Sequence, residues 1–240
     1  MRQILLTLLL ISAITATGAS ALRPTDARPG IALADFCWSE AEADTLTPQL
    51  LEAFRSYEIP EAVAERMRGK SYPEGCPIPL SDLRYLIIPH FDGHGSVRLG
   101  EMVCHRSVAR QLLDIFRELF AARYPIERMV LIDDYDADDE RSMSANNTTC
   151  FCYRTVAGSR KLSRHSLGKA VDINPLYNPM VNRKSGTVVP GAAREWADRT
   201  IADNPYVVRR GDAAWRAFTR RGWRWGGSWR TRPDYQHFQL

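Results

Sequence analysis

Two short stretches, far apart in the chain, constrain the fold more than any other feature. The first, Ser163–Asp172, has the sequence SRHSLGKAVD, and the second, Asp234–His237, has the sequence DYQH close to the end. Together they offer two imidazoles and two carboxylates, a set that suits one zinc ion and a group that works on its water. The fold must bring the two stretches together if they share a site. A core histidine and a capping aspartate are the alternative explanation of the same residues.

The first 21 residues have the pattern of a signal peptide. A positive charge at Arg2 precedes an apolar run from Ile4 to about Ala16, and small residues then end in Ala19-Ser20-Ala21. The apolar run is short for a bilayer span, and no later segment is apolar for long enough to cross one. We therefore expect a secreted or periplasmic protein of the cell envelope that has no transmembrane segment once the signal is removed.

The rest of the chain divides at a segment rich in proline and glycine, Ser71–Leu80. We predict an N-terminal tether and helical extension over residues 22–80 and a main domain over residues 81–240. Residues 22–33 lack periodicity and form the predicted tether. Two short helices are expected in the extension, the first starting at Thr47 and the second over Pro60–Arg68.

The main domain has alternating signals for strands and helices. The predicted strands are Leu83–Pro89, Val97–Cys104, Ile126–Asp133, Cys150–Val156, Lys169–Asn174 and Tyr235–Leu240. The predicted helices are Ser107–Arg123, which has the clearest apolar face, and Asp212–Arg221, whereas the acidic segment Asp133–Asn147 is expected to be a loop. This order predicts an α+β fold with a mostly antiparallel sheet and flanking helices.

Charge is unevenly distributed along the chain. Residues 150–240 hold 17 Lys and Arg against 6 Asp and Glu, a net charge of +11, although the whole chain has a formal charge of only +4. A positive potential in this part would attract an anionic substrate such as a peptide carboxylate. Nucleic acid is the competing partner, but the expected export and the lack of a helix-turn-helix or RNA-binding signature disfavour it.

Five cysteines follow the predicted signal peptide, and export makes disulfides plausible. Five is an odd number, so at least one thiol is left over; Cys37 with Cys76 is the favoured bridge. Cys150 and Cys152 point to one face of a predicted strand, and we interpret them as bridge partners or core thiols in preference to zinc ligands.

A catalytic zinc needs three protein ligands and an open position. His165, Asp172 and His237 supply that number, and Gly168 gives the chain the freedom to bring His165 over the same site. Asp234 lies three residues before His237, close enough to act on the zinc water without ligating the metal. It would serve as general base and then as general acid toward the leaving amine.

These motifs resemble those of the M15 metallopeptidases, the D-alanyl-D-alanine carboxypeptidase group. The resemblance rests on Ser163-x-His165-x-x-Gly168-x-Ala170-x-Asp172, Trp223-x-Trp225-Gly226-Gly227-x-Trp229, Asp234-x-x-His237, Asp139-x-x-Ser142-Met143, Asn146-Asn147, Phe151-x-x-Arg154, Asp172-Ile173-Asn174-Pro175 and Asn178-Pro179. It covers roughly residues 83–240 and leaves residues 22–80 unexplained.

The resemblance implies a zinc ion held by His165, Asp172 and His237, with Asp234 as the catalytic carboxylate. It also implies the fold shared with the Hedgehog signalling domain and a peptidoglycan stem peptide as substrate, cleaved by a carboxypeptidase or endopeptidase. Arg154 matches the position of a family arginine near the substrate carbonyl or carboxylate, so we assign it substrate binding and oxyanion stabilisation.

Three assignments keep an alternative. Ser163 either binds substrate or caps the turn before His165. The tryptophans at positions 223, 225 and 229 either pack as a corner that fixes the strand with His237 or stack on sugar rings, and the corner is favoured. His90 and His94 are assigned to a surface turn, because neighbouring proline and glycine exclude a helical metal motif.

For the protein as a whole, a zinc-dependent peptidase is the leading hypothesis. The alternative is a zinc-stabilised module that binds cell wall without catalysis, and a zinc hydrolase for a non-peptide amide would share the same mechanism. The presence of Asp234 favours an enzyme, since a structural zinc site needs no additional carboxylate. The sequence does not decide the oligomeric state.

Overall fold

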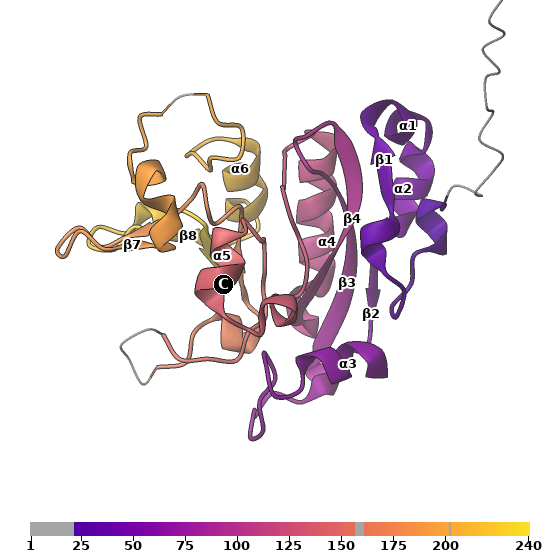
Figure 1. Ribbon diagram of the computed structural model, residues 1–240, viewed down its shortest axis with the longest axis horizontal. Coiled ribbons are helices and arrows are strands. Elements are labelled where there is room, and N and C mark those ends of the chain that lie inside the picture. Colours follow the sequence, from indigo (N-terminus) through magenta and orange to yellow (C-terminus); the bar gives the residue numbers. More distant parts are fainter. Residues whose placement is uncertain (1–21, 157–160, 202) are drawn as a thin grey trace, which may run out of the picture.

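A computed structural model describes residues 22–156, 161–201 and 203–240 and gives the architecture in Figure 1. The predicted signal peptide, residues 1–21, lies outside the described residues. The fold is α+β, with a curled antiparallel sheet and several helices, as the sequence predicted. Among the described residues, no helix has the length and apolar character needed to span a membrane.

The main sheet is built on one long hairpin. β3 (Leu83–Phe91) pairs antiparallel with β4 (Ser96–His105) over its whole length. β1 (Cys37–Ser39) pairs with β4 and β2 (Arg55–Tyr57) pairs with β3, which gives the order β1-β4-β3-β2. Almost every residue of β3 is buried, because structure covers both faces of the strand. The predicted hairpin is therefore confirmed, with slightly longer strands.

Helix α4 (Arg106–Ala121) confirms the strongest helix prediction. His105 caps its start by accepting a hydrogen bond from the backbone N–H of Ser107 at 3.1 Å. The apolar stripe of the helix is buried and packs mainly on β3 and on α6 (Ala213–Thr219). The helix thus joins the main sheet to the C-terminal part of the molecule.

The N-terminal extension packs against this sheet. Its helices are α1 (Glu40–Thr45), α2 (Thr47–Ala53) and α3 (Glu61–Met67). The predicted tether over residues 22–33 is not a free segment, because Ala27 and Leu33 are buried in the core. The extension also supplies β1 and β2 to the sheet, so the proposed division at residue 81 separates segments that share one sheet.

Charged side chains bind the extension to the rest of the fold. Asp133 is buried, and its two carboxylate oxygens accept hydrogen bonds from the backbone N–H and the hydroxyl of Ser71, both at 3.0 Å. Arg66 on α3 makes a bidentate contact with Glu101 on β4, with distances of 2.9 and 2.6 Å. Pairing of this kind satisfies buried carboxylates, which would otherwise be costly to bury.

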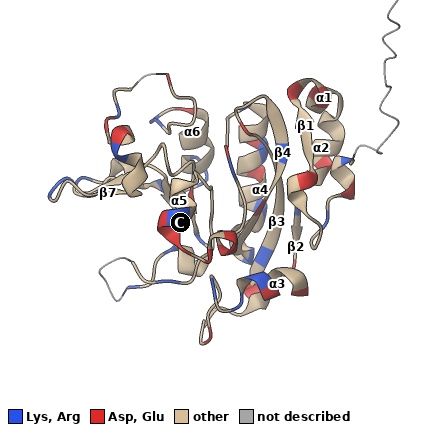
Figure 2. Ribbon diagram, in the orientation of Figure 1, with Lys and Arg blue, Asp and Glu red and all other residues tan. Residues whose placement is uncertain are grey.

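The C-terminal part contains a second, smaller sheet. β5 (Ala170–Asp172), β9 (His237–Gln239) and β8 (Arg224–Trp225) form it in the order β5-β9-β8. β6 (Met180–Val181) and β7 (Val188–Val189) form a separate ribbon. Figure 2 shows basic residues along the loop beside β7, in the half of the chain that the sequence identified as basic.

Three sequence predictions for the segments around the site differ from the structure. Residues 126–133 and 150–156 were expected as strands, but their pairing is limited to isolated bridges, such as Arg128 to Asn147 and Thr155 to Leu162, and the first segment ends in a 3-10 turn, Ile132–Tyr135. The acidic segment 133–147 was expected as a loop, but it contains helix α5 (Asp139–Ser144). Asp138 caps this helix by accepting a hydrogen bond from the Arg141 N–H, and the helix has too few apolar residues to show a periodicity.

The disulfide prediction is wrong for this structure. All five cysteines are free, including the proposed pair of Cys37 and Cys76. Cys37 lies on the edge strand β1, whereas Cys76 lies in the turn after α3, so neither the sheet nor a helix pairs the two segments. Cys150 and Cys152 are buried thiols, which confirms the interpretation as core thiols.

Candidate active site

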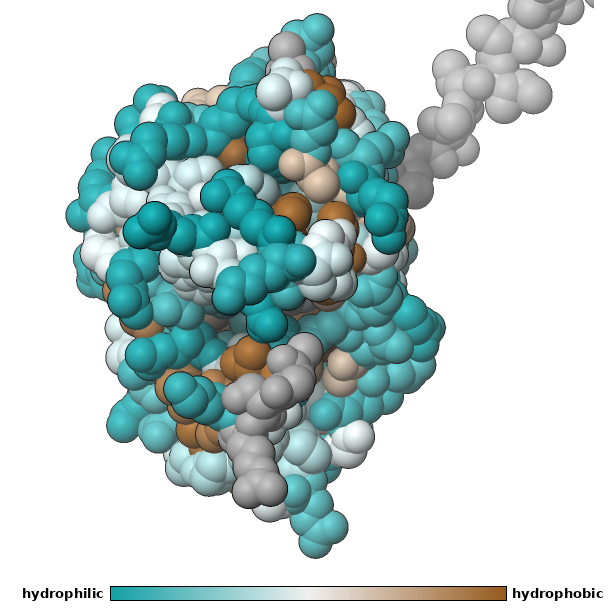
Figure 3. Space-filling view, turned by 90° about the vertical axis from the view of Figure 1, so that its left-hand side faces the viewer, coloured by the Kyte–Doolittle hydropathy of each residue, from teal (hydrophilic) through white to brown (hydrophobic). Residues whose placement is uncertain are grey.

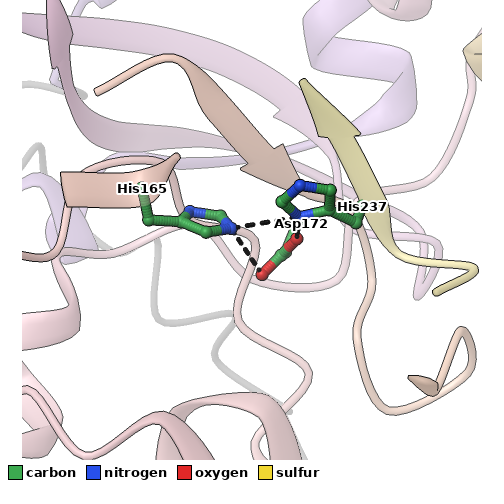
Figure 4. Close-up of side chains that lie close together, drawn as sticks. All are labelled: His165, Asp172 and His237. Carbon is green, nitrogen blue, oxygen red and sulfur yellow. Dashed lines mark hydrogen bonds and ion pairs between the residues drawn. The ribbon is translucent and has the colours of Figure 1, made fainter. Parts of the chain in front are cut away.

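Strand pairing brings Asp172 and His237 together. In the antiparallel pair of β5 and β9, Asp172 lies directly opposite His237. Directly opposite residues on one face of an antiparallel pair have neighbouring side chains, so two residues 65 positions apart in sequence become neighbours. Figure 4 shows the two side chains directed toward each other, with His165 approaching from a third segment.

A tight turn places His165 against the same strands. The residue begins a single 3-10 turn, His165–Leu167, that ends at Gly168 in the left-handed conformation with φ of 60°. A Cβ atom at position 168 would lie 2.5 Å from the backbone nitrogen of His105. Only glycine therefore fits both the conformation and the close approach to β4. The role predicted for Gly168 is confirmed.

The three predicted metal ligands converge. His165 Nε2 lies 3.1 Å from Asp172 Oδ2, and His237 Nδ1 lies 2.9 Å from Asp172 Oδ1. The two imidazole nitrogens are 3.2 Å apart. Of the described residues, these three form the group whose ligand atoms all lie within 4.8 Å of one another. All three are buried.

Hydrogen bonds on the far side of each imidazole fix which nitrogen faces the site. His165 Nδ1 lies 2.6 Å from the carbonyl oxygen of Cys150, and His237 Nε2 lies 3.1 Å from Gln239 Oε1. Both partners are acceptors, so each outer nitrogen carries a hydrogen, and the inner nitrogens that face Asp172 are the atoms that would ligate a metal. This is the outer-shell arrangement expected of histidines that ligate a metal. The donor set and its orientation fit zinc.

The electrostatics of the cluster reflect two imidazoles around one carboxylate. Burial alone would raise the pKa of Asp172, but the charge of His165 and hydrogen bonds from both histidines hold it well below its ordinary value. Burial alone would lower the pKa of His237, but its hydrogen bond to Asp172 raises it to about 9. Asp172 is thus ionised, as a metal-ligating carboxylate must be.

Asp234 lies beside this cluster. Its backbone N–H donates to the carbonyl oxygen of Gly226 at 3.0 Å, and its segment bridges to Met180. Its Oδ1 atom is buried and has no hydrogen-bond partner among the described residues. Burial raises the pKa of Asp234 to about 6, and the nearby charge of Asp172 acts in the same direction. Asp234 thus lines the pocket beside the three candidate ligands, with one carboxylate oxygen left without a partner.

Arg154 lines the pocket and makes an ion pair that the sequence did not predict. Its Nε atom makes an ion pair with Asp139 at the start of α5. Burial alone would lower the pKa of Arg154, but the charges of Asp139 and Asp172 raise it above its ordinary value, so the guanidinium stays charged. The backbone N–H of Arg154 donates to the hydroxyl of Ser166 at 2.8 Å, which fixes its segment beside the turn at His165.

Ser163 has the capping role that was one of its two alternatives. Its hydroxyl accepts a hydrogen bond from the backbone N–H of His165 at 3.3 Å, and its own N–H donates to the carbonyl oxygen of Arg154 at 3.0 Å. The side chain is buried but also lines the pocket. Ser163 therefore positions His165, and its contact with substrate stays a prediction.

One pocket of about 420 Å³ contains all the predicted site residues. Its lining includes Arg154, Ser163, His165, Asp172, Asp234 and His237. Exposed apolar side chains also line it, namely Val156, Leu162 and Trp229. Figure 3 shows apolar residues gathered between hydrophilic ones on the face of the molecule to the left in Figure 1. The volume and mixed lining are those of a small-ligand pocket.

Trp223, Trp225 and the two glycines form the packed corner that the sequence favoured, whereas Trp229 is exposed and lines the pocket. Trp223 is buried and donates a hydrogen bond from Nε1 to Gln111 Oε1 at 2.6 Å. Trp225 donates from Nε1 to the carbonyl oxygen of Tyr235 at 2.8 Å, which holds the segment before His237. A Cβ atom at Gly226 would lie 2.7 Å from the carbonyl oxygen of Asp234. The corner thus positions the segment that contains Asp234 and His237.

Sequence reasoning gave no role to several residues that support the site. Asp139 belongs to one of the motifs that resemble the family. Its ion pair with Arg154 joins two segments that are distant in sequence, so no local pattern could predict it. Gln239 is two residues after His237 on the same strand, and this spacing is the only signal that places it on the same face. His90, assigned to a surface turn, is instead buried within β3.

Comparison with known proteins agrees with this geometry. Residues 157–240, which carry the three predicted ligands and Asp234, match a family model described as D-alanyl-D-alanine carboxypeptidase. The match supports an M15 family peptidase. A peptidase of this family hydrolyses a peptide substrate, and the His, Asp and His group has the composition that such a zinc site requires. No curated protein and no solved structure gives a significant match to the chain.

Proposed function

We propose that this protein is an exported zinc-dependent peptidase that hydrolyses stem peptides of peptidoglycan. The observation that supports it most is the position of Asp234, whose buried and unpartnered carboxylate oxygen lies in the same pocket as His165, Asp172 and His237. A purely structural zinc site needs no such carboxylate, whereas hydrolysis needs a group that moves protons.

The ligands in this proposal are His165 Nε2, Asp172 and His237 Nδ1, oriented by Cys150 and Gln239. Zinc bound there would supply Lewis acidity toward the scissile carbonyl and make water more acidic. With a pKa of about 6, Asp234 is mostly ionised at neutral pH and can accept a proton from the attacking water. Its pKa is also close enough to neutrality for it to donate that proton to the leaving amine.

Arg154 would stabilise negative charge that develops on the carbonyl oxygen. The ion pair with Asp139 holds the guanidinium at Nε, and the terminal nitrogens would bind the substrate. A fixed cation in a largely buried site costs little reorganisation as charge develops. Asp139 is thus a positioning residue in the proposal, acting through Arg154.

Two further parts of the proposal rest on sequence. Residues 1–21 would export the chain to the cell envelope, where peptidoglycan is accessible. The catalytic part would share the fold of M15 peptidases and the Hedgehog signalling domain, which the α+β architecture supports at the level of fold class only. The net charge of +11 over residues 150–240 would attract acidic stem peptides.

A pair of variants tests the division of roles. We expect Asp234→Ala to abolish peptide hydrolysis while retaining one zinc per chain, and His237→Ala to lose both. Zinc content by atomic spectroscopy and hydrolysis by mass spectrometry would be measured on the same preparations. His94→Ala is the control, because this exposed histidine lies outside the pocket and should change neither quantity. Full activity in the Asp234 variant would remove the basis of the assignment.

A further inference from the structure

The pocket has two cations whose charges are not neutralised within the protein. Arg164 and Arg232 both line it and are exposed. Within residues 22–156, 161–201 and 203–240, neither guanidinium has an ion pair or a side-chain hydrogen bond. Arg154, by contrast, is paired with Asp139. Two free guanidinium groups at a pocket favour a substrate that brings its own carboxylates.

Backbone hydrogen bonds hold the segment that contains Arg232 and Asp234. The segment from Thr231 to Asp234 runs antiparallel to β6 and the residues after it. The N–H of Val181 donates to the carbonyl oxygen of Pro233 at 2.8 Å, and the N–H of Arg183 donates to the carbonyl oxygen of Thr231 at 3.1 Å. Met180 bridges to Asp234 in the same register. Arg232 and Asp234 are two residues apart in this segment, and both line the same pocket. Arg232 and Asp234 therefore enter the pocket together.

This arrangement assigns Arg232 to the leaving-group side of the scissile bond. Asp234 is the proposed proton donor to the leaving amine, so the leaving residue must lie against the segment that contains both side chains. In a substrate cleaved at its last peptide bond, the terminal carboxylate is only two covalent bonds from that amine nitrogen. Arg232 is the cation of the pocket that shares a segment with Asp234, whereas Arg164 precedes His165 on another segment.

We propose that Arg232 binds the free C-terminal carboxylate of the substrate and thereby makes the enzyme selective for carboxypeptidase cleavage. This inference rests on the proposed peptidase function and specifies its substrate: a peptide with a free C-terminus, cleaved at its last bond. A guanidinium binds a carboxylate through two parallel hydrogen bonds, a geometry that an amide at the same position cannot reproduce. The apolar side chains of Val156, Leu162 and Trp229 leave room in the same pocket for small apolar substituents of the peptide.

The test compares one acylated tripeptide ending in D-Ala-D-Ala with the same peptide carrying a C-terminal amide. For the zinc-loaded protein we expect kcat/KM to be at least about tenfold higher for the acid, as expected for a charge-assisted hydrogen bond. Arg232→Ala should reduce this preference to within about twofold, mainly by raising KM for the acid, and Arg232→Lys should restore part of it. Arg164→Ala and Arg230→Ala, the latter an exposed arginine outside the pocket, should keep the preference.

Binding provides a second measurement that does not depend on turnover. In zinc-loaded Asp234→Asn, calorimetry should show the acid binding at least about tenfold more tightly than the amide, and addition of Arg232→Ala should remove the difference. If the wild-type protein cleaves neither peptide, the proposed peptidase function fails, and this binding comparison still decides the role of Arg232. An unchanged preference in Arg232→Ala, a preference lost in Arg164→Ala instead, or equal binding of acid and amide would overturn the proposal.

Discussion

Gly226→Ala should disturb the catalytic segment although the residue carries no side chain of its own. Its Cβ atom would lie 2.7 Å from the carbonyl oxygen and 3.0 Å from the Cβ of Asp234, and 3.3 Å from the Cβ of His237. These are backbone-near atoms that cannot rotate away, so the strand must shift. Overpacking of this kind costs about 1–3 kcal/mol of unfolding free energy. Because the candidate ligand His237 would move with the strand, zinc affinity should fall by about 10- to 100-fold.

The assay combines two measurements on purified protein. The free energy of unfolding comes from denaturant titration, and zinc affinity comes from competition with a chromophoric chelator. Gly191→Ala is the matched control: its Cβ would meet only Glu140 Oε1, at 3.4 Å, and the change should stay within about 0.5 kcal/mol. If Gly226→Ala and Gly191→Ala behaved alike in both measurements, the corner would not position the site as argued.

Three further predictions concern stability. Burial lowers the pKa of His90 to about 4, against about 6.5 in the unfolded chain, so its stabilising contribution is complete above pH 6.5 and is lost as the pH falls toward 4. We expect denaturant titrations to show a loss of about 3 kcal/mol of unfolding free energy over that range. A His90→Gln variant whose unfolding free energy fell as steeply with pH as that of the wild type would contradict this. Gly168→Ala should lower the unfolding free energy by at least about 2 kcal/mol and weaken zinc binding, because φ of 60° and the contact with His105 both exclude a Cβ atom. A variant that bound zinc as tightly as the wild type would contradict this. Asp133→Asn should lower the unfolding free energy by about 1–3 kcal/mol and speed proteolysis near Ser71, since the variant's amide replaces a carboxylate that accepts two hydrogen bonds; unchanged proteolysis would refute that role.

Periodicity and turn residues predicted the elements that have local signals. The apolar strands of the hairpin, the apolar face of α4 and the capping Asp212 of α6 are all set by neighbours within a few residues. Elements defined by long-range pairing were harder to predict. Residues 126–133 have the composition of a strand, but they find only single bridges because their partners are a strand edge and a loop.

The three candidate metal ligands could be predicted because their spacing belongs to a recognisable motif, and the structure brings all three together. What surrounds them depends on contacts between distant segments. The carbonyl oxygen of Cys150 orients His165, and Asp139 fixes Arg154, but neither interaction has a local sequence signature. Arg232 also gave no signal, because the role proposed for it depends on the pairing that places its segment, together with Asp234, at the pocket.

The most direct measurement of the central claim is mass spectrometry of defined peptidoglycan stem peptides after incubation with the mature, zinc-loaded protein. Asp234→Asn would be run in parallel as a variant that keeps the metal ligands. The account predicts loss of a terminal D-Ala with the wild-type protein and intact peptide with the variant. Intact peptides in every reaction, despite one zinc per chain, would contradict the account and favour a module that binds cell wall without cleaving it.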